Sequence, residues 1–337
     1  MSGQIAIVGA GTMGTGIAVN AAMNGFSVIL LDANPRSVEQ ARPRMQKMLD
    51  RHSAKGRLGE RENRDSFGRI TVTSALDALR SAPLVIEAVF EDFDVKARLL
   101  TQLGDICPDE AVIATNTSAL QVSALAECVR NPGRFLGMHY FSPADSSPVV
   151  ELVRGDQTRA DAVARAGEFL ARTNRDVLLC RDSPGFAINR FFVPFLNAAA
   201  QAVDAGMGTV GQINRLGQDL TGAPIGPFEA MNFIKPEIVL HAQGNLGVLG
   251  DFYKPAAGLA RLVERGELWC IEDTPPRLAD AEKARGVLLR SILIPAVAMQ
   301  DEGVANPVDV DRCARSALKW AKGPYCSEWA GTALSEC

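Results

Sequence analysis

The fold of this chain is decided near its N-terminus by Ile5-Ala6-Ile7-Val8-Gly9-Ala10-Gly11-Thr12-Met13-Gly14. The first four residues form a short apolar run typical of a buried strand, and the next six form a G-x-G-x-x-G pattern. A helical pattern follows to Met23, and a second strand pattern, Phe26–Asp32, ends on an acid. This order of strand, glycine-rich turn, helix and strand predicts a dinucleotide-binding unit.

The glycine-rich turn and the acid that follows it favour NAD as the dinucleotide. Glycines let the backbone approach the pyrophosphate, which binds at the N-terminus of the helix. A carboxylate at Asp32 would accept hydrogen bonds from the adenosine ribose and repel a 2′-phosphate, so NAD is favoured over NADP. A tight turn without a ligand is the other interpretation. The expected cofactor contacts are Gly9, Gly11, Thr12, Met13, Gly14 and Asp32.

The two halves of the chain have different patterns. In the first half, further apolar runs at Leu84–Glu87, Val112–Thr115 and Phe135–His139 alternate with helical segments, which predicts a parallel sheet covered on both faces. The second half is helical, with expected helices at Ala187–Asp204, Val210–Leu220, Pro227–His241, Ala256–Glu267, Ala279–Asp301 and Pro307–Leu318. The predicted fold is a Rossmann-type doubly wound α/β domain, residues 1–183, followed by an all-α domain, residues 184–337.

The helical half contains two stretches with similar short motifs, which suggests an internal repeat. Asp204-Ala205-Gly206 resembles Asp301-Glu302-Gly303, and Gly226-Pro227 resembles Gly323-Pro324. Two related units, residues 184–245 and 279–337, would explain this similarity. Chance similarity between amphipathic helices would explain it as well.

Composition excludes several classes of function. The chain has 337 residues, 47% of them hydrophobic and 22% charged, with a net charge of −4. These values are typical of a globular enzyme and disfavour nucleic-acid binding as the main activity. The seven cysteines include no CxxC pair, which argues against disulfides and a metal site. With no signal peptide pattern and no apolar stretch long enough to span a bilayer, we expect a cytoplasmic protein.

His139 is the strongest candidate for proton transfer. It ends the apolar run Phe135–Met138, at the sheet edge where ligands bind in such folds. Glu151 lies in a second apolar run, where a buried carboxylate needs a partner, and an imidazole would serve. Exposure of Glu151 on an alternating strand is the other interpretation. The remaining histidines, His52 and His241, are expected to be solvated or to cap helices.

Several motifs together resemble the 3-hydroxyacyl-CoA dehydrogenase family. They are Asn116-Thr117-Ser118, Gly137-Met138-His139-Tyr140-Phe141-Ser142-Pro143, Val149-Val150-Glu151-Leu152-Val153, Asp182-Ser183-Pro184-Gly185-Phe186-Ala187-Ile188-Asn189-Arg190 and Gly226-Pro227-Phe228-Glu229. The resemblance implies that His139 is the general base that oxidises a 3-hydroxyl group with NAD, and that Glu151 is its partner. It implies that Ser118 and Asn189 are hydrogen-bond donors to the substrate. The cofactor contacts that it adds are Glu91, Lys96, Asn116, Ser118 and Ser142.

The segment between His139 and Glu151 departs from the family pattern. Ser142 stands where the family usually has asparagine, and Ala144-Asp145-Ser146-Ser147 replaces apolar residues. If Asp145 and Ser146 border the acyl channel, a short polar acyl group is expected, because burying a fatty chain there would desolvate polar groups. Pro148, which directly precedes Val149-Val150-Glu151, is similar to a feature of relatives of the gulonate and carnitine dehydrogenase type. Those relatives oxidise free polar 3-hydroxy acids.

A basic stripe raises the question of the acyl carrier. Arg44, Lys47, Arg51 and Lys55 are spaced to share one helix face. The resemblance implies that coenzyme A binds there, and an acidic acyl carrier protein would suit the same face. A solvated helix face is the third interpretation.

Three functions compete at this point. They are a dehydrogenase of 3-hydroxyacyl thioesters, a dehydrogenase of free polar 3-hydroxy acids, and a non-catalytic NAD-binding structural protein. The presence of Ser118, His139, Glu151 and Asn189 favours an enzyme. Family members pair through the helical domain, so we expect a homodimer, or a monomer if a second helical unit fills that surface.

Overall fold

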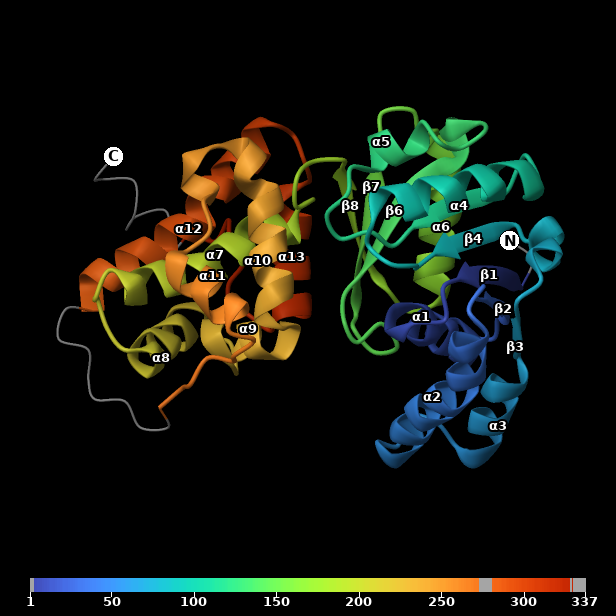
Figure 1. Cartoon of the computed structure of the whole chain (residues 1–337), viewed down its shortest axis with the longest axis horizontal. Coiled ribbons are helices and arrows are strands. Elements are labelled where there is room, and N and C mark those ends of the chain that lie inside the picture. Colours follow the sequence, from blue (N-terminus) through green and yellow to red (C-terminus); the bar gives the residue numbers. More distant parts are fainter. Residues whose placement is uncertain (1–2, 273–280, 328, 330–337) are drawn as a thin grey trace. The chain divides into compact units, whose positions relative to one another are not determined.

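The computed structural model describes residues 3–272, 281–327 and 329. The chain divides into two compact units, Met1–Asp182 and Ser183–Cys337. The first unit contains a sheet with helices on its faces, and the described part of the second is built from helices (Figure 1). The predicted fold class, a Rossmann-type α/β domain followed by a helical domain, is confirmed.

The sheet of the first unit has eight strands in the order β3-β2-β1-β4-β5-β6-β7-β8. Their bounds are β1 Gln4–Val8, β2 Ser27–Leu31, β3 Ile70–Thr73, β4 Leu84–Glu87, β5 Val112–Thr115, β6 Phe135–Tyr140, β7 Val149–Arg154 and β8 Asp176–Arg181. The first six strands are parallel, β7 is antiparallel to β6, and β8 is parallel to β7. The carboxyl ends of β1 to β6 therefore meet at one edge.

Two helices of the first unit begin at residues whose side chains cap the helix N-terminus. The helices of this unit are α1 Thr12–Met23, α2 Pro35–Ala54, α3 Glu60–Gly68, α4 Phe93–Ile106, α5 Val122–Ala126 and α6 Ala160–Arg172, with short 3₁₀ turns at Leu76–Ser81 and Pro132–Arg134. The side chain of Asn34 accepts a hydrogen bond from the N–H of Arg36, and Pro35 follows it as the first helical residue of α2. Asp92 caps α4 in the same way. Such caps satisfy N–H groups that have no partner within the helix.

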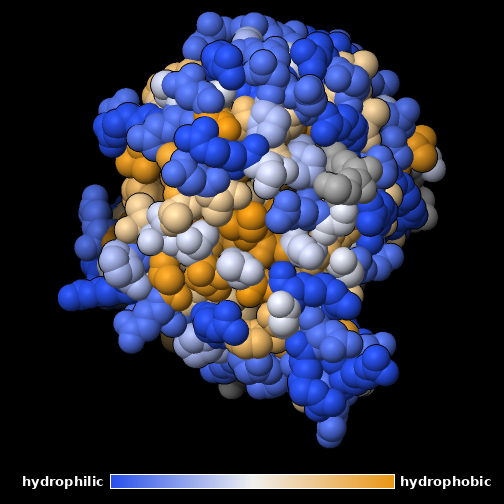
Figure 2. Space-filling model, turned by 90° about the vertical axis from the view of Figure 1, so that its right-hand side faces the viewer, coloured by the Kyte–Doolittle hydropathy of each residue, from blue (hydrophilic) through white to orange (hydrophobic). Residues whose placement is uncertain are grey.

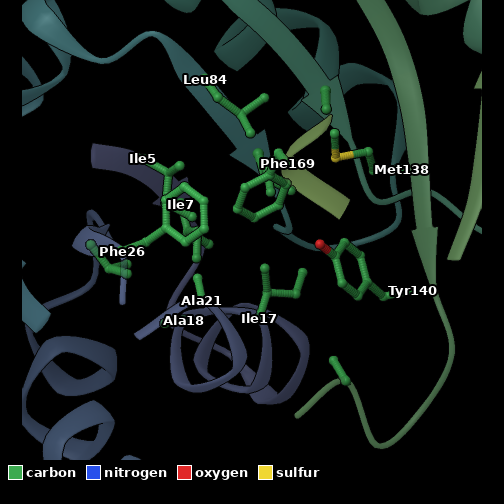
Figure 3. Close-up of a cluster of buried hydrophobic side chains, with 14 of the residues drawn as sticks. Ile5, Ile7, Ile17, Ala18, Ala21, Phe26, Leu84, Met138, Tyr140 and Phe169 are labelled. Atoms are coloured by element: carbon green, nitrogen blue, oxygen red, sulfur yellow. The ribbon is translucent and has the colours of Figure 1, made fainter. Parts of the chain in front are cut away.

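A buried apolar cluster holds α1 and α6 against the sheet. Figure 3 shows Ile17 of α1 beside Tyr140 of β6, and Phe26 beside Phe169 of α6. The rings of Phe26 and Phe169 meet edge to face with centroids 5.1 Å apart. All four side chains are at most 2% exposed. This packing fixes the N-terminal end of α1 next to the carboxyl edge of the sheet, where we place the site.

Helices α2 and α3 form a polar hairpin. The carboxamide Nδ2 of Asn63 on α3 donates to the Ser53 hydroxyl on α2 over 3.0 Å. In Figure 2, hydrophilic residues cover most of the visible face, including the projection at the bottom, which is this hairpin. Hydrophobic residues gather nearer the middle of the same face. The hairpin thus presents charged side chains to solvent.

The second unit differs from the sequence prediction at one helix break. Its helices are α7 Ile188–Asp204, α8 Val210–Thr221, α9 Pro227–Ile234, α10 Pro236–Leu246, α11 Ala257–Glu264, α12 Ala281–Asp301 and α13 Pro307–Leu318, with 3₁₀ turns at Gly247–Leu249 and Asp251–Tyr253. The single helix expected over Pro227–His241 is wrong, because Lys235 adopts a φ of 93° and separates α9 from α10. Pro236 has no N–H to donate and disfavours a helical residue before it.

Two turns of the second unit share one hydrogen-bonding pattern. After α7, the N–H of Met207 donates to the carbonyl oxygen of Ala202, and after α12 the N–H of Val304 donates to that of Met299. The next helices, α8 and α13, have 12 residues each and follow side-chain caps at Thr209 and Asn306.

A second correspondence follows these helices. The side-chain oxygen Oδ1 of Asn214 in α8 accepts a hydrogen bond of 3.0 Å from the N–H of Phe228. At the matching place after α13, Oδ1 of Asp311 accepts one of 2.8 Å from the N–H of Tyr325. In both cases the acceptor lies 14 residues before the donor.

Candidate active site

The glycine-rich turn joins β1 to α1 and is shaped for close approach of a ligand. Gly9 has a φ of 110°, and a Cβ atom there would overlap the carbonyl oxygen of Ala88. A Cβ at Gly14 would overlap the carbonyl oxygen of Gly9, whereas one at Gly11 would meet nothing within 4 Å. Gly11 caps α1 without a side-chain hydrogen bond. The backbone N–H groups at this helix end therefore fit the phosphates of a dinucleotide.

Asp32 lies directly beside this turn. Its Oδ2 atom accepts a hydrogen bond of 2.8 Å from the N–H of Ala10, and its Oδ1 atom accepts one of 2.8 Å from the N–H of Asn34. A carboxylate oxygen has a further acceptor position beyond one hydrogen bond. The structure therefore keeps Asp32 where the adenosine ribose of a bound dinucleotide would be expected.

Glu91 and Lys96 form an ion pair after β4. The Nζ atom of Lys96 lies 3.3 Å from Oε2 of Glu91, and the Lys96 side chain is only 1% exposed whereas that of Glu91 is 29% exposed. Burial raises the pKa of Glu91, but the Lys96 ammonium and hydrogen bonds from Thr117 and Ser118 outweigh it and lower the pKa overall. Of the pair, Glu91 is the member that can meet a ligand.

His139 and Glu151 are joined side chain to side chain. They are register partners on the antiparallel strands β6 and β7. The Nδ1 atom of His139 lies 2.6 Å from Oε2 of Glu151, and the two residues are 6% and 0% exposed. A buried carboxylate in this position orients the imidazole ring. The arrangement suits a general base whose proton transfer runs through Nε2.

The turn after β5 brings two more predicted residues to this edge. The Oδ1 atom of Asn116 accepts a hydrogen bond of 2.9 Å from the N–H of Tyr140, next to His139. The N–H of Ser118 donates to Oε1 of Glu91 over 2.8 Å. Ser142 is exposed just beyond β6. Within the first unit, the predicted residues from β1, β4, β5 and β6 therefore lie at one sheet edge. Asn189 belongs to the second unit, in the first turn of α7.

The carboxylate of Asp145 is paired with two neighbouring side chains. Its side chain is 1% exposed, and Oδ2 lies 2.9 Å from Nε2 of His52 and 2.9 Å from an Nη atom of Arg51. The expectation that Asp145 borders the acyl channel stays a prediction, and its carboxylate is engaged by this pairing. The expectation that His52 is solvated or capping is wrong, because the ring is 4% exposed and paired. Both groups are buried as a pair, which limits the cost of desolvation.

The basic stripe on α2 is divided by these contacts. Arg44 donates from Nη1 to the carbonyl oxygen of Ala10 over 2.9 Å, which ties it to the glycine-rich turn. Arg51 is paired with Asp145. Lys47 and Lys55 are exposed. The stripe predicted as one anion-binding face therefore has two members that bond within the protein, of which the Arg51 side chain is still 49% exposed, and two further members that are exposed.

Sequence reasoning missed two buried groups that support the site. Glu87 is fully buried at the end of β4 and bonds Lys96 over 2.7 Å. Arg175 donates to the backbone carbonyls of Ala144 and Asp145 over 3.1 Å each. For Glu87, the only local indication in the sequence was an acidic residue at the end of the apolar run Leu84–Glu87. No signal in the sequence near Arg175 indicates its partners.

Two negative observations apply to the described residues. Across residues 3–272, 281–327 and 329, no three His, Cys, Asp or Glu side chains gather closely enough to hold a metal ion. In the same part of the chain, no helix combines the length and apolarity needed to cross a bilayer.

Comparison with known families assigns both units. The family model of the 3-hydroxyacyl-CoA dehydrogenase NAD-binding domain matches residues 4–183, and that of the 3-hydroxyacyl-CoA dehydrogenase C-terminal domain matches residues 185–269. This chain belongs to the 3-hydroxyacyl-CoA dehydrogenase family. The resemblance predicted from the motifs is confirmed, and so is NAD as the cofactor. The dehydrogenase is accordingly an NAD-dependent oxidoreductase.

Relatives of the dehydrogenase carry related names. A 3-hydroxybutyryl-CoA dehydrogenase of Mycobacterium tuberculosis is 34% identical over 271 residues, covering 79% of this chain and 94% of the relative. The crystal structure of (S)-3-hydroxybutyryl-CoA dehydrogenase from Ralstonia eutropha is 31% identical with a TM-score of 0.76, covering 79% of this chain and 94% of that one. The structure of an Escherichia coli 3-hydroxybutyryl-CoA dehydrogenase, 22% identical, matches the fold with a TM-score of 0.87 over 97% of this chain and 91% of its own.

Proposed function

We propose that this dehydrogenase oxidises the 3-hydroxyl group of a short-chain 3-hydroxyacyl-CoA with NAD, and catalyses the reverse reduction. The observation that carries the proposal is the buried His139–Glu151 pair, with 2.6 Å between Nδ1 and Oε2, at the sheet edge that also holds the glycine-rich turn. The relatives named as 3-hydroxybutyryl-CoA dehydrogenases support the substrate class.

The proposed chemistry assigns a role to each of the two paired residues. His139 takes the proton of the substrate 3-hydroxyl through Nε2, because Nδ1 is bonded to Glu151. Glu151 holds the ring in orientation and stabilises the imidazolium that forms. NAD, when bound, accepts the hydride that leaves C3. In the reverse direction, the protonated ring returns the proton to the developing alkoxide.

Ser118 and Asn189 are proposed to donate hydrogen bonds to the substrate oxygen as its charge develops. Donors that are fixed before the reaction stabilise such charge without reorganisation. The position of Ser118 is set by its N–H bond to Glu91 and that of Asn189 by the first turn of α7. Both roles are those that the family motifs imply.

Coenzyme A is the proposed carrier. Lys47 on α2 and Lys55, the residue that follows this helix, are exposed and are the stripe residues proposed to meet its phosphates. Arg44 and Arg51 are engaged by Ala10 and Asp145, so they contribute less to an outside anion. An acyl carrier protein is the alternative that the test below distinguishes.

The acyl group is proposed to be short. Since the Asp145 carboxylate is buried against His52, we propose that it does not form a polar wall of the channel. Ser146 and Ser147 remain partly exposed in the same loop and stay candidates for it. The names of the relatives favour a four-carbon chain.

We also propose a domain organisation. Residues 1–183 form the NAD-binding domain, and residues 184–245 and 279–337 form two related helical units, of which 279, 280, 328 and 330–337 lie outside the described residues. The matching turns after α7 and α12 and the matching contacts of Asn214 and Asp311 support this relation. A cytoplasmic location and a homodimeric or monomeric state stay predictions.

NADH formation with a panel of substrates tests the proposed function. The panel contains 3-hydroxybutyryl-CoA, 3-hydroxydecanoyl-CoA, the matching acyl carrier protein thioesters, and free 3-hydroxybutyrate and gulonate. We expect the highest kcat/KM with 3-hydroxybutyryl-CoA. A preference for a free acid or for the protein-bound thioester would overturn the carrier, and a preference for the ten-carbon chain would overturn the acyl group.

A further inference from the structure

A chain of three alternating charges, two of them buried, runs from β4 to the turn that carries Ser118. Its members are Glu87, Lys96 and Glu91, and we refer to it as the charge chain. The Nζ atom of Lys96 lies 2.7 Å from Oε1 of Glu87 and 3.3 Å from Oε2 of Glu91. Lys96 is 1% exposed and Glu87 is fully buried. A cation this deeply buried is stable only with such partners.

Glu87 is held rigidly at one end of the charge chain. Its Oε1 atom also accepts the N–H of Val89 over 2.7 Å, and its Oε2 atom accepts the hydroxyl of Thr115 over 2.6 Å. The residue therefore ties the end of β4 to the end of β5. These ends lie beside the glycine-rich turn, because Gly9 packs against the backbone of Ala88.

Glu91 is the other end of the charge chain and reaches the site. Its Oε1 atom accepts the Thr117 hydroxyl over 2.5 Å, the Ser118 N–H over 2.8 Å and the Ala119 N–H over 3.3 Å. One carboxylate oxygen thus organises the whole turn. Hydrogen bonds to an ionised acceptor are stronger than those to a neutral one, so the turn depends on the charge of Glu91.

Lys96 has little capacity left for a ligand. An ammonium group has three N–H donors. Those of Lys96 meet Glu87, Glu91 and, at 3.4 Å, the carbonyl oxygen of Val89. Its contribution to the site therefore passes through Glu91, and its own position depends on Glu87.

We propose that Glu87 is a positioning residue for the dehydrogenase reaction, which acts through Lys96 and Glu91 to fix the turn Thr117–Ala119 and the cofactor-facing carboxylate of Glu91. This inference rests on the proposed assignment of Ser118 and Glu91 to the site. Glu87 itself touches neither cofactor nor substrate. Its removal should loosen the turn even when no cofactor is bound.

The test compares Glu87→Gln, Lys96→Met and the double variant with the wild-type enzyme. In enzyme without NAD, we expect faster amide hydrogen exchange in the segment 116–121, measured against strand β5. We expect the Kd for NADH and the KM for NAD to rise about tenfold, as for coupled residues of one ion-pair network, with a smaller change in kcat. The double variant should resemble either single variant, because the three charges act in series.

A matched control is a buried cation at the opposite edge of the sheet. Arg134 is 1% exposed, precedes the amino end of β6 and donates to backbone carbonyls such as that of Gly104. Arg134→Met should lower the Tm without changing NADH binding or exchange in the segment 116–121. The proposal is overturned if Glu87→Gln behaves in the same way.

Failure of the proposed site can be told from failure of this inference. If Ser118→Ala keeps full activity, the role proposed for Ser118 is wrong. The exchange of the 116–121 amides in Glu87→Gln still reports on the charge chain in that case. If Glu87→Gln does not fold, the neutral pair Glu87→Gln/Lys96→Met, which leaves no unpaired buried cation, provides the same comparison. Unchanged exchange and NADH binding in that variant would equally overturn the inference.

Discussion

The Nδ1 atom of His139 lies 2.6 Å from the Oε2 atom of Glu151, although the two residues are separated by a loop and a change of strand direction. The antiparallel register places them directly opposite each other on β6 and β7. A fully buried carboxylate needs a charge or hydrogen-bond partner, and the imidazole supplies one. The pair is therefore the feature from which the chemistry of this site follows.

Replacing His139 by alanine should abolish turnover and leave NADH binding intact. Loss of a general base typically costs about 10²–10⁴-fold in rate. Steady-state kinetics and NADH fluorescence titration measure the two effects separately. His241→Ala, on an exposed residue of α10, is the control. A His139→Ala enzyme with near-normal kcat would refute the proposed mechanism.

Glu151→Gln should lower kcat severely while the Michaelis constant for NAD changes little. The amide keeps the shape of the side chain but removes the charge that stabilises the imidazolium. We expect a loss of at least about 10²-fold, by analogy with the loss of other groups that support a general base. Similar kcat values in the variant and the wild-type enzyme would show that Glu151 is only structural.

Asp32→Asn should reduce discrimination between NAD and NADP. The wild-type enzyme should prefer NAD by about tenfold or more in kcat/KM, because the carboxylate repels a 2′-phosphate. The asparagine keeps an acceptor for the N–H of Ala10 but removes the charge. Equal use of both cofactors by the wild-type enzyme would contradict the prediction.

Changing both Lys47 and Lys55 to glutamine should raise the KM for 3-hydroxybutyryl-CoA, more at low salt than at high salt. Exposed charges are screened by salt, so their effect fades as ionic strength rises. The double change Arg61→Gln/Arg64→Gln on α3 alters the net charge equally and serves as the control. If both double variants raise the KM alike, the effect comes from overall charge and not from the stripe.

The contribution of Glu91 to stability should disappear in acid. Its pKa is lowered in the folded state from an ordinary value of 4.5, so it stabilises the fold above that value and loses this effect as the pH falls through the folded-state pKa. The Tm difference between wild type and Glu91→Gln should therefore be largest near pH 7 and shrink below about pH 4. A difference independent of pH would mean that the charge of Glu91 does not matter.

Local patterns in the sequence predicted much of the architecture. The strand, glycine-rich turn and helix at Ile5–Met23 follow from periodicity and from the conformational freedom of glycine, which are properties of neighbouring residues. The break between α9 and α10 is also local, since Pro236 determines it. The prediction of one helix there overlooked this signal. Strands β3 and β8, at the two edges of the sheet, are too weakly patterned to stand out.

The sequence by itself determined the class of fold and NAD as the cofactor, because these depend on motifs whose residues lie close together. It also predicted the pairing of His139 with Glu151, which the register of β6 and β7 brings about. Only the tertiary structure decided that Asp145 is buried against His52, 93 residues earlier in the chain. It also placed Lys96 between Glu87 and Glu91. The reason is physical: a buried charge must find an opposite charge or a hydrogen bond, and packing, not sequence spacing, decides which partner is within reach.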